Sequence, residues 1–293
     1  MCFVENGCRS KNWQHERAAA QARVWFAPLT VRLTIDLFIM IAKRLSFGVA
    51  CFLALSVQAQ TYNFTSTTSA TNGWQPYSPL ASFGVTSTFS EGFYGYLMES
   101  SASPNPAALG AARVGSFLPG TYTDFSLNFS VLSYNGAGSE FVGAAARFSN
   151  LGLGTSSGYV MGYESGVGTG GALFIAKVVD EASKGAIGAG AEAAVTLAAG
   201  QGYEFTFSGT GTALSGAVYS LANLNTPLAT VSGTDSSFAS GQLGLLVADE
   251  SSAGTGTPGA SFGQFTVVPE PGCGALLVLG GLTLWAARTG RKH

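Results

Sequence analysis

Apolar and polar residues alternate with a period of two along much of the chain. In residues 125–131, FSLNFSV, nearly every second side chain is large and apolar, as an antiparallel strand with one buried face requires. Residues 203–207, YEFTF, repeat the pattern. Further strands are expected in the stretches FVGAAARF, GYVMGY, GALFIAKVV, SGAVYSL, GQLGLLVA and SFGQFTVV. The pattern predicts a body built of β-strands.

Glycine-rich turn sequences such as YNGAGS, SGVGTGG and SGTGT separate these strands. Short strands with such connections are typical of a sandwich or jelly roll. The Ala-rich residues 182–200 could hold a short helix, although their glycines disfavour one. Residues 61–121 are rich in proline and fit the pattern less clearly; we expect them to supply edge strands, a separate small domain being the alternative. The predicted domain spans residues 60–267.

The order of the motifs resembles that of the laminin G-like or concanavalin A-like jelly roll. The motifs run from GAAARFS, GYVMGYES and GALFIAKVV through GYEFTFSGTGTALSGAVYS to FASGQLGLLVADE and ASFGQFTV, over residues 122–267. The resemblance rests on pattern and includes no catalytic signature. It implies an all-β fold, an antiparallel sandwich, which the sequence flanks with an N-terminal signal helix and a C-terminal hydrophobic helix.

Residues 40–59 have the organisation of a secretory signal peptide. Lys43 and Arg44 precede an apolar run, and Val57 and Ala59 place small side chains at positions −3 and −1 of a cleavage site. The alternative is a permanent anchor, but charged residues interrupt the apolar stretch, and its uninterrupted part is shorter than the ~20 residues that a span needs. We therefore predict export.

Residues 1–39 would place this signal well inside the chain, so we interpret them as an upstream start-site extension and Met40 as the true start. Of the four cysteines, Cys51 lies in the signal, Cys273 lies near the C-terminus and the other two lie in the extension. The predicted domain therefore has neither a disulfide framework nor a thiolate metal site.

The C-terminus, residues 268–293, has three consecutive parts. The first contains the motif Pro269, Glu270 and Pro271. An apolar run over residues 272–287 follows, and the chain then ends in the basic residues Arg288, Arg291 and Lys292. The block resembles the PEP-CTERM sorting signal of Gram-negative bacteria. The resemblance implies recognition by a membrane-embedded transpeptidase of the exosortase type, a place in the cell envelope, outer surface or extracellular matrix, and an association with exopolysaccharide.

The length and charge of this block agree with a membrane segment. Sixteen residues would form a helix of about 24 Å, shorter than the ~30 Å hydrocarbon core. The basic end would stay on the cytoplasmic side of the inner membrane. A plain transmembrane helix that is retained is the alternative to a processed signal.

Charge excludes one large class of partners. Residues 61–267 contain four basic and twelve acidic residues, a net charge of −8. Such a body cannot neutralise a row of phosphates, so nucleic-acid binding is not expected.

The sequence offers no catalytic machinery, and we expect no enzyme. Ser156 occupies the nucleophile position of a G-x-S-x-G match, GTSSG, but the chain's histidines are His15 and His293, both outside the predicted domain. The G-x-G-x-x-G match in residues 166–171 precedes a predicted strand, so we interpret it as a hairpin turn and not a dinucleotide site. The alternative activity is a carbohydrate-active enzyme with paired carboxylates, for which Glu164 stands alone on its strand.

No cofactor is expected, and no metal site built from histidine. Calcium needs only oxygen ligands, and the candidates are Asp180, Glu181, Asp235, Asp249 and Glu250. None lies in a calcium-loop motif, so solvated surface carboxylates are the favoured interpretation.

Binding of a polysaccharide is the leading hypothesis for function. Aromatic rings beside a carboxylate suit sugars, and the candidate contacts are Tyr159, Tyr163, Glu164 and Tyr219. The alternative is that these tyrosines are sheet residues with their hydroxyls at the rim. A structural or adhesive surface protein without a small ligand is the other alternative.

Intact mass spectrometry of the native protein tests both processing signals. We expect a mature chain that begins near Gln60 and ends near Pro271. Retention of residues 1–39, or an intact tail in the mature envelope form, would contradict the two signals.

Overall fold

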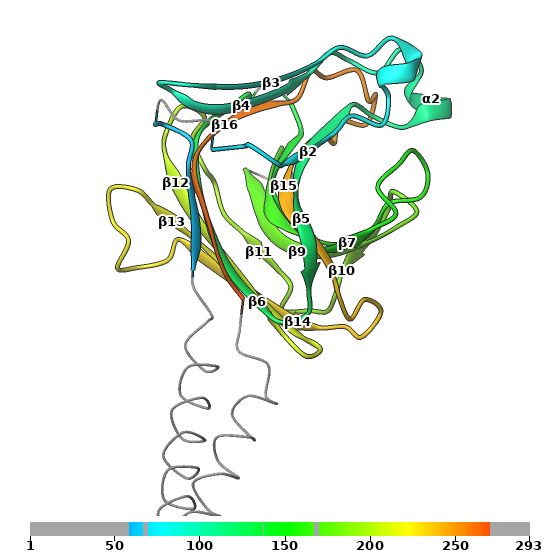
Figure 1. Cartoon of the computed structure of the whole chain (residues 1–293). Helices are drawn as coiled ribbons and strands as arrows, with labels where there is room; N and C mark the ends of the chain where they lie inside the picture. Colours follow the sequence, from blue (N-terminus) through cyan, green and yellow to red (C-terminus); the bar gives the residue numbers. More distant parts are fainter. Residues whose placement is uncertain (1–58, 67–69, 137, 167–169, 270–293) are drawn as a thin grey trace, which may run out of the picture. The chain divides into compact units, whose positions relative to one another are not determined.

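The computed structural model describes residues 59–66, 70–136, 138–166 and 170–269 (Figure 1). These residues form two antiparallel sheets packed as a sandwich, which confirms the predicted all-β fold class. The predicted extension, residues 40–58 of the predicted signal peptide and the apolar tail lie outside the described residues, as do Glu270 and Pro271. Within the described ranges, no helix is long and apolar enough to span a membrane.

Sheet A has the strand order β14-β13-β12-β6-β16-β4-β3, and β1 also pairs with β16. Its strands are β1 (Gln60–Asn63), β3 (Ser87–Gly92), β4 (Gly95–Ser100), β6 (Phe125–Tyr134), β12 (Tyr203–Thr210), β13 (Ala213–Ser220), β14 (Ala229–Thr234) and β16 (Gly259–Pro269).

Sheet B has the order β10-β9-β8-β7-β15-β5-β2, and β11 also pairs with β9. Its strands are β2 (Gln75–Tyr77), β5 (Arg113–Tyr122), β7 (Glu140–Ser149), β8 (Ser157–Ser165), β9 (Gly171–Val179), β10 (Ala182–Ala186), β11 (Glu192–Ala194) and β15 (Gly241–Asp249). Two short helical segments, η1 (Ala81–Phe83) and α2 (Pro106–Leu109), lie in the connections.

Strand β16 holds sheet A together, because it pairs with three strands. Its first half pairs with β4, its last half pairs with β1, and β6 lies along the other side (Figure 1). In the β1–β16 register, Gln60 lies opposite Val267. The beginning and the end of the sandwich are therefore neighbouring strands.

The core between the sheets is dominated by large side chains at the alternating positions that the sequence predicts. Phe129 of β6 and Phe205 of β12 lie opposite each other in register, and their rings stack with centroids 5.0 Å apart. Neither side chain is exposed. Cross-strand aromatic pairs of this kind stabilise a sheet beyond the area that they bury.

Three local expectations can be compared with the structure. The Ala-rich segment 182–200 forms strands β10 and β11, so a helix there is wrong, and its glycines explain why. Residues 61–121 supply most of β1, all of β2 to β4 and most of β5 to the same two sheets. Strands β2 and β3 lie at the sheet edges, as expected, whereas β4 and β5 are paired on both sides. Residues 166–171 connect the antiparallel neighbours β8 and β9, which confirms a hairpin.

Replacing Phe129 by alanine is expected to lower the free energy of unfolding by about 3–5 kcal/mol, because it leaves a cavity beside Phe205. Urea denaturation followed by circular dichroism measures the change. Ser215→Ala, at an exposed hydroxyl pair on β13, is the control and should change stability by less than about 0.5 kcal/mol. Equal losses in the two variants would contradict the packing described.

Candidate functional site

The outer face of sheet B is apolar, in addition to its core-facing side. A second cluster of buried apolar residues lies there, separate from the core: Tyr77, Phe117, Phe141, Ala145, Phe148, Val160, Ala176 and Ala248. Half-buried Phe174, Val178 and Leu246 pack against it. Antiparallel sheets commonly present one face to water. On this apolar face, the half-buried Phe174, Val178 and Leu246 are the part that a ligand can reach.

Glycines allow the aromatic rings to pack directly against the backbone of this face. A Cβ added to Gly158 would lie 2.4 Å from the Phe148 ring. The Phe141 ring covers the cross-strand pair Gly143 and Gly162, where added Cβ atoms would lie 2.7 and 2.8 Å from it. Because the rings take the place of absent side chains, the floor is closely packed. Its rings are tilted against one another, Phe141 by 42° to Phe174.

This floor forms the base of a groove of about 470 Å³, within the range of ligand sites. The groove follows β8, since Ser156, Val160 and Glu164 all line it. Eight residues of extended chain correspond to roughly 26 Å. One side is formed by α2 and the turn after it, and another by the β9–β10 turn. The groove therefore fits an extended ligand.

An ion pair anchors one wall of the groove. The Arg113 guanidinium donates to both oxygens of Glu181, at 3.0 and 2.7 Å. Arg113 also donates to the carbonyl oxygen of Ala111 at 2.7 Å, which fixes the segment after α2. Tyr77 and the Gly154 N–H donate to the same carboxylate. Such bidentate pairs fix side-chain geometry.

The same contacts determine the charge state of Glu181. Burial opposes its ionisation, but the hydrogen bonds from Arg113, Tyr77 and Gly154 outweigh that effect and lower the pKa of the carboxyl. Burial, together with the bond to Glu181, raises the pKa of Tyr77. The Glu181 carboxylate in this wall thus accepts hydrogen bonds from all three of these residues.

The turn that carries Glu181 is strained. Asp180 and Glu181 both have positive φ angles, 52° and 62°, a conformation that costs a residue other than glycine about 1–2 kcal/mol. Two bonds hold the turn: Glu181 N donates to Ser156 O at 2.7 Å, and Asp180 N donates to the Ser157 hydroxyl at 2.9 Å. Positive φ angles at both central residues are those of a two-residue β-hairpin turn, here between β9 and β10.

Two further carboxylates lie at the other end of the groove. Glu164 accepts a hydrogen bond from the Ser139 hydroxyl at 3.1 Å, and burial raises its pKa. Glu250 is exposed at the mouth, yet the groove walls desolvate its carboxyl, and the charges of Glu164 and Asp249 add to the effect, raising its pKa to about 7. Each group favours a nearby cation over an anion.

Glu140 and Asp249 lie opposite each other in register at this end and are buried. Asp249 accepts bonds from the N–H groups of Ser251 and Gly256, which shape the loop before β16. Glu140 accepts from the Gly259 N–H at 2.7 Å, which links β7 of sheet B to β16 of sheet A. These two side chains are structural.

The structure separates the four predicted ligand contacts. Glu164 lines the groove. Tyr159 and Tyr163 are 0% and 1% exposed and point into the core, where their hydroxyls donate to Asp235 and to the Gly170 carbonyl. Tyr219 lies half-buried on β13 of sheet A. The two buried rings are therefore out of reach of a ligand.

The other predicted residues have packing roles. The Ser156 hydroxyl is buried, donates to Gly152 O and bonds the Tyr77 hydroxyl, and no histidine lies in the described residues. The solvated interpretation of the calcium candidates is wrong for Asp249 and Glu181, which are bonded as above, and for Asp235, which pairs with Lys177 at 3.0 Å. Among the described residues, no group of three acidic, histidine or cysteine side chains could hold a metal.

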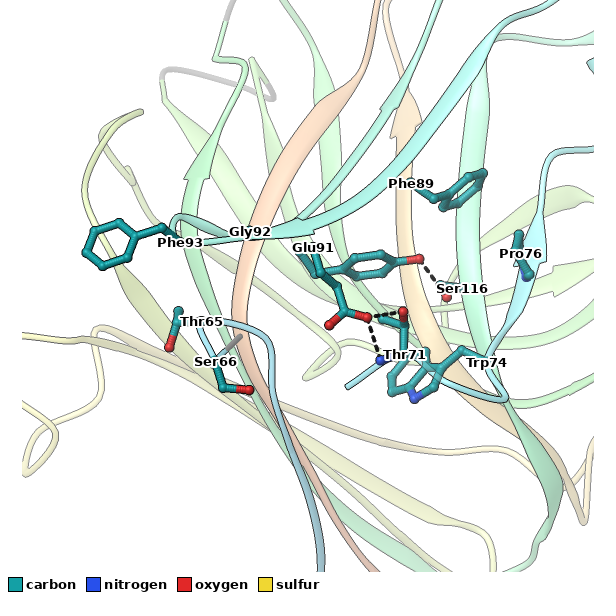
Figure 2. Close-up of a pocket in the computed structure, with 11 residues that line it drawn as sticks. Thr65, Ser66, Thr71, Trp74, Pro76, Phe89, Glu91, Gly92, Phe93 and Ser116 are labelled. Atoms are coloured by element: carbon teal, nitrogen blue, oxygen red, sulfur yellow. Dashed lines mark hydrogen bonds between the residues drawn. The ribbon is translucent and has the colours of Figure 1, made fainter. Parts of the chain in front are cut away.

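A second cavity of about 550 Å³ opens beside the β3–β4 hairpin. Figure 2 shows the Glu91 carboxylate directed at Thr71, whose backbone N–H donates to it at 2.7 Å, while Phe93 projects away from them. Glu91 also accepts from the Ala70 N–H. Because its oxygens are occupied by this neighbouring segment, we interpret Glu91 as a loop anchor.

Sequence reasoning missed the phenylalanine floor and Arg113. The available signal was the nearly continuous apolar character of FVGAAARF and GALFIAKVV, which is typical of strands covered on both faces.

No protein-family model matches the chain, and no curated protein matches it significantly. Among solved structures, the carbohydrate-binding module CBM66 from Bacillus subtilis is similar with 16% identity, over 67% of this chain and 95% of that one, at a TM-score of 0.47. Basic winged bean lectin has 11% identity, over 73% and 100%, at 0.46. A legume lectin-like domain from Entamoeba histolytica has 10% identity, over 72% and 97%, at 0.46. These likenesses assign no role to any residue of this chain.

Stability should fall as the pH rises between about 5 and 8, in part because of Glu140. Burial raises its pKa from 4.5 to about 8; the Gly259 N–H lowers it, and Asp249 raises it. Within this window the folded state keeps a proton that the unfolded chain releases, so the free energy of unfolding declines with pH. Each unit of the pKa difference corresponds to about 1.4 kcal/mol.

Glu140→Gln should flatten this dependence, measured as urea midpoints at pH 5.5 and 8. Glu99→Gln, at an exposed position on β4, is the control and should keep the slope of the unaltered protein. An unchanged slope in Glu140→Gln would show that Glu140 does not retain its proton.

Proposed function

We propose that the protein is an exported, non-enzymatic envelope or matrix protein that binds polysaccharide in the groove of sheet B. The observation that carries the proposal is the form of the groove: an apolar floor, accessible at Phe174, Val178 and Leu246, that extends along β8 for roughly 26 Å and has polar groups at its ends. A polysaccharide offers the complementary surface, since its sugar rings have apolar C–H faces and polar edges.

The polar groups at the rim can orient such a chain. Glu164 and Glu250 can accept hydrogen bonds from sugar hydroxyls at one end of the groove, and Asp180 can do so at the other. Apolar sites with a few fixed polar groups are the usual form of ligand sites. Side chains that packing already holds in place lose little conformational entropy on binding, which favours affinity.

The carboxylates of the groove favour binding over cleavage. A glycosidase needs one protonated acid and one ionised carboxylate that is free to act as base or nucleophile. Glu181 has a lowered pKa, but it accepts from Arg113, Tyr77 and Gly154. Glu164 and Glu250 both have raised pKa values. Asp180, which makes no ion pair within the described residues, lies at the other end of β8 from Glu164, much farther than the roughly 5–10 Å that separates a glycosidase pair.

The localisation of the protein is part of the same proposal. Signal cleavage after Ala59 would leave β1 intact, since β1 begins at Gln60. The Pro-Glu-Pro motif begins at Pro269, the last residue of β16. Sorting by an exosortase-type transpeptidase would then leave the sandwich complete, with the inner membrane as a temporary partner through the apolar tail.

Phe174→Ala is expected to weaken polysaccharide binding about tenfold, because the ring packs on Phe141 at 5.5 Å and forms part of the groove. Affinity electrophoresis of the full-length protein in gels containing glucans, galactans, mannans or alginate measures the loss. Tyr219→Ala, a half-buried aromatic on sheet A, is the matched control and should bind like the unaltered protein.

Retained binding in Phe174→Ala together with loss in Tyr219→Ala would place the ligand on sheet A and overturn the proposal. Release of reducing ends from any polymer that binds would overturn its non-enzymatic part. A melting curve for each variant separates lost binding from lost folding.

A further inference from the structure

We infer that the groove selects a cationic polysaccharide, one built of amino sugars with free ammonium groups. The inference rests on the proposed function and specifies its ligand class. It is carried by the balance of charges along the groove, where unpaired carboxylates flank an apolar floor.

The charges that line the groove do not cancel. Arg113 is the single cation among the described residues that line it, against five carboxylates: Glu164, Asp180, Glu181, Asp249 and Glu250. Arg113 is neutralised by Glu181. Asp249 is 4% exposed and accepts two backbone N–H groups.

Three carboxylates therefore remain available to a ligand. Glu164, Asp180 and Glu250 make no ion pair with any lysine or arginine of the described residues, whose pairs involve Glu181, Asp124 and Asp235. Arg147 and Lys177 are held in two of those pairs, and Lys184, the remaining cation of the described residues, does not line the groove. An anionic polymer would meet uncompensated repulsion here, whereas an ammonium group would gain a partner.

The positions of the carboxylates match a repeating cation. Glu164 lies at the end of β8, and Asp180 lies at the β9–β10 turn beside Ser157, the first residue of β8. The two are thus separated by nearly the length of the strand, roughly 20–25 Å. A polymer with a positive charge on each unit can reach both ends while its rings rest on the floor between them.

A cationic peptide would carry similar charge but fits less well. Peptides in extended form usually pair with a free sheet edge or place side chains in pockets. This groove lies on the face of sheet B, mainly over β5, β7, β8, β9 and β15, which are already paired on both sides. The edge strands β2 and β10 contribute Tyr77, Ala182 and Ser183 to its rim. Its floor is packed over glycines, and the half-buried Phe174, Val178 and Leu246 offer apolar surface to the C–H face of a sugar ring.

Glucosamine hexamer and N-acetylglucosamine hexamer are the decisive probes, because they differ mainly in charge. Isothermal titration of the full-length protein should give tighter binding of the glucosamine hexamer, by about five- to tenfold, as two part-exposed ion pairs provide. Raising the salt concentration should reduce this preference. Glu164→Gln combined with Glu250→Gln should also reduce it, and Glu99→Gln on β4 should leave it unchanged.

Equal affinity for the two hexamers would overturn the charge selection. If Phe174→Ala abolishes that equal binding, the proposed polysaccharide groove is still supported. Equal binding of lysine hexamer and glucosamine hexamer would also overturn the inference, since charge alone would then explain binding. A preference that persists in the Glu164→Gln, Glu250→Gln variant would place the ammonium contacts elsewhere and would equally overturn it.

Discussion

The sandwich depends on the pairing of β16, the last strand that the structure describes, with β1, β4 and β6. Without β16, sheet A separates into a β3–β4 hairpin and a group of strands around β6, and β1 has no partner. Sheet A cannot close until the C-terminal part of the domain is available. Long-range pairing of this kind makes folding slow, and it places Gln60 beside Val267, so that both predicted processing points border the same strand pair.

Sheet B meets a different constraint, because both of its faces are apolar. Strand β7 shows this most clearly, since all of its residues from Glu140 to Phe148 are buried. Its inner side packs on sheet A, while its outer side is covered by its own rings lying on glycines. The high glycine content, 40 of 293 residues, therefore has a structural function besides forming turns. The same packing holds the floor of the groove in place.

The fold could be predicted from the sequence wherever one face of a strand was polar. Strands β6 and β12 follow the alternation of residues 125–131 and 203–207. The site could be predicted only in part, because its residues come from distant segments: Arg113 and Glu181 are separated by 68 positions. The sequence places no second carboxylate beside Glu164 on its strand, but the fold brings Glu250 close enough for the two charges to interact. Tyr159 and Tyr163 illustrate the limit of composition, since the alternation that placed them on β8 could not say that they face the core while Glu164 faces the groove.

The partly exposed apolar face of the groove carries a risk, since two copies of the chain could associate through it. The residues between 61 and 267 carry a net charge of −8, and the unpaired carboxylates Glu164, Asp180 and Glu250 border that face. Two copies brought face to face would place these charges against each other, which disfavours self-association. A cationic ligand removes the same repulsion when it binds. The carboxylates can therefore protect the face when it is empty and select its ligand when it is filled, and both effects follow from leaving them without cationic partners within the described part of the chain.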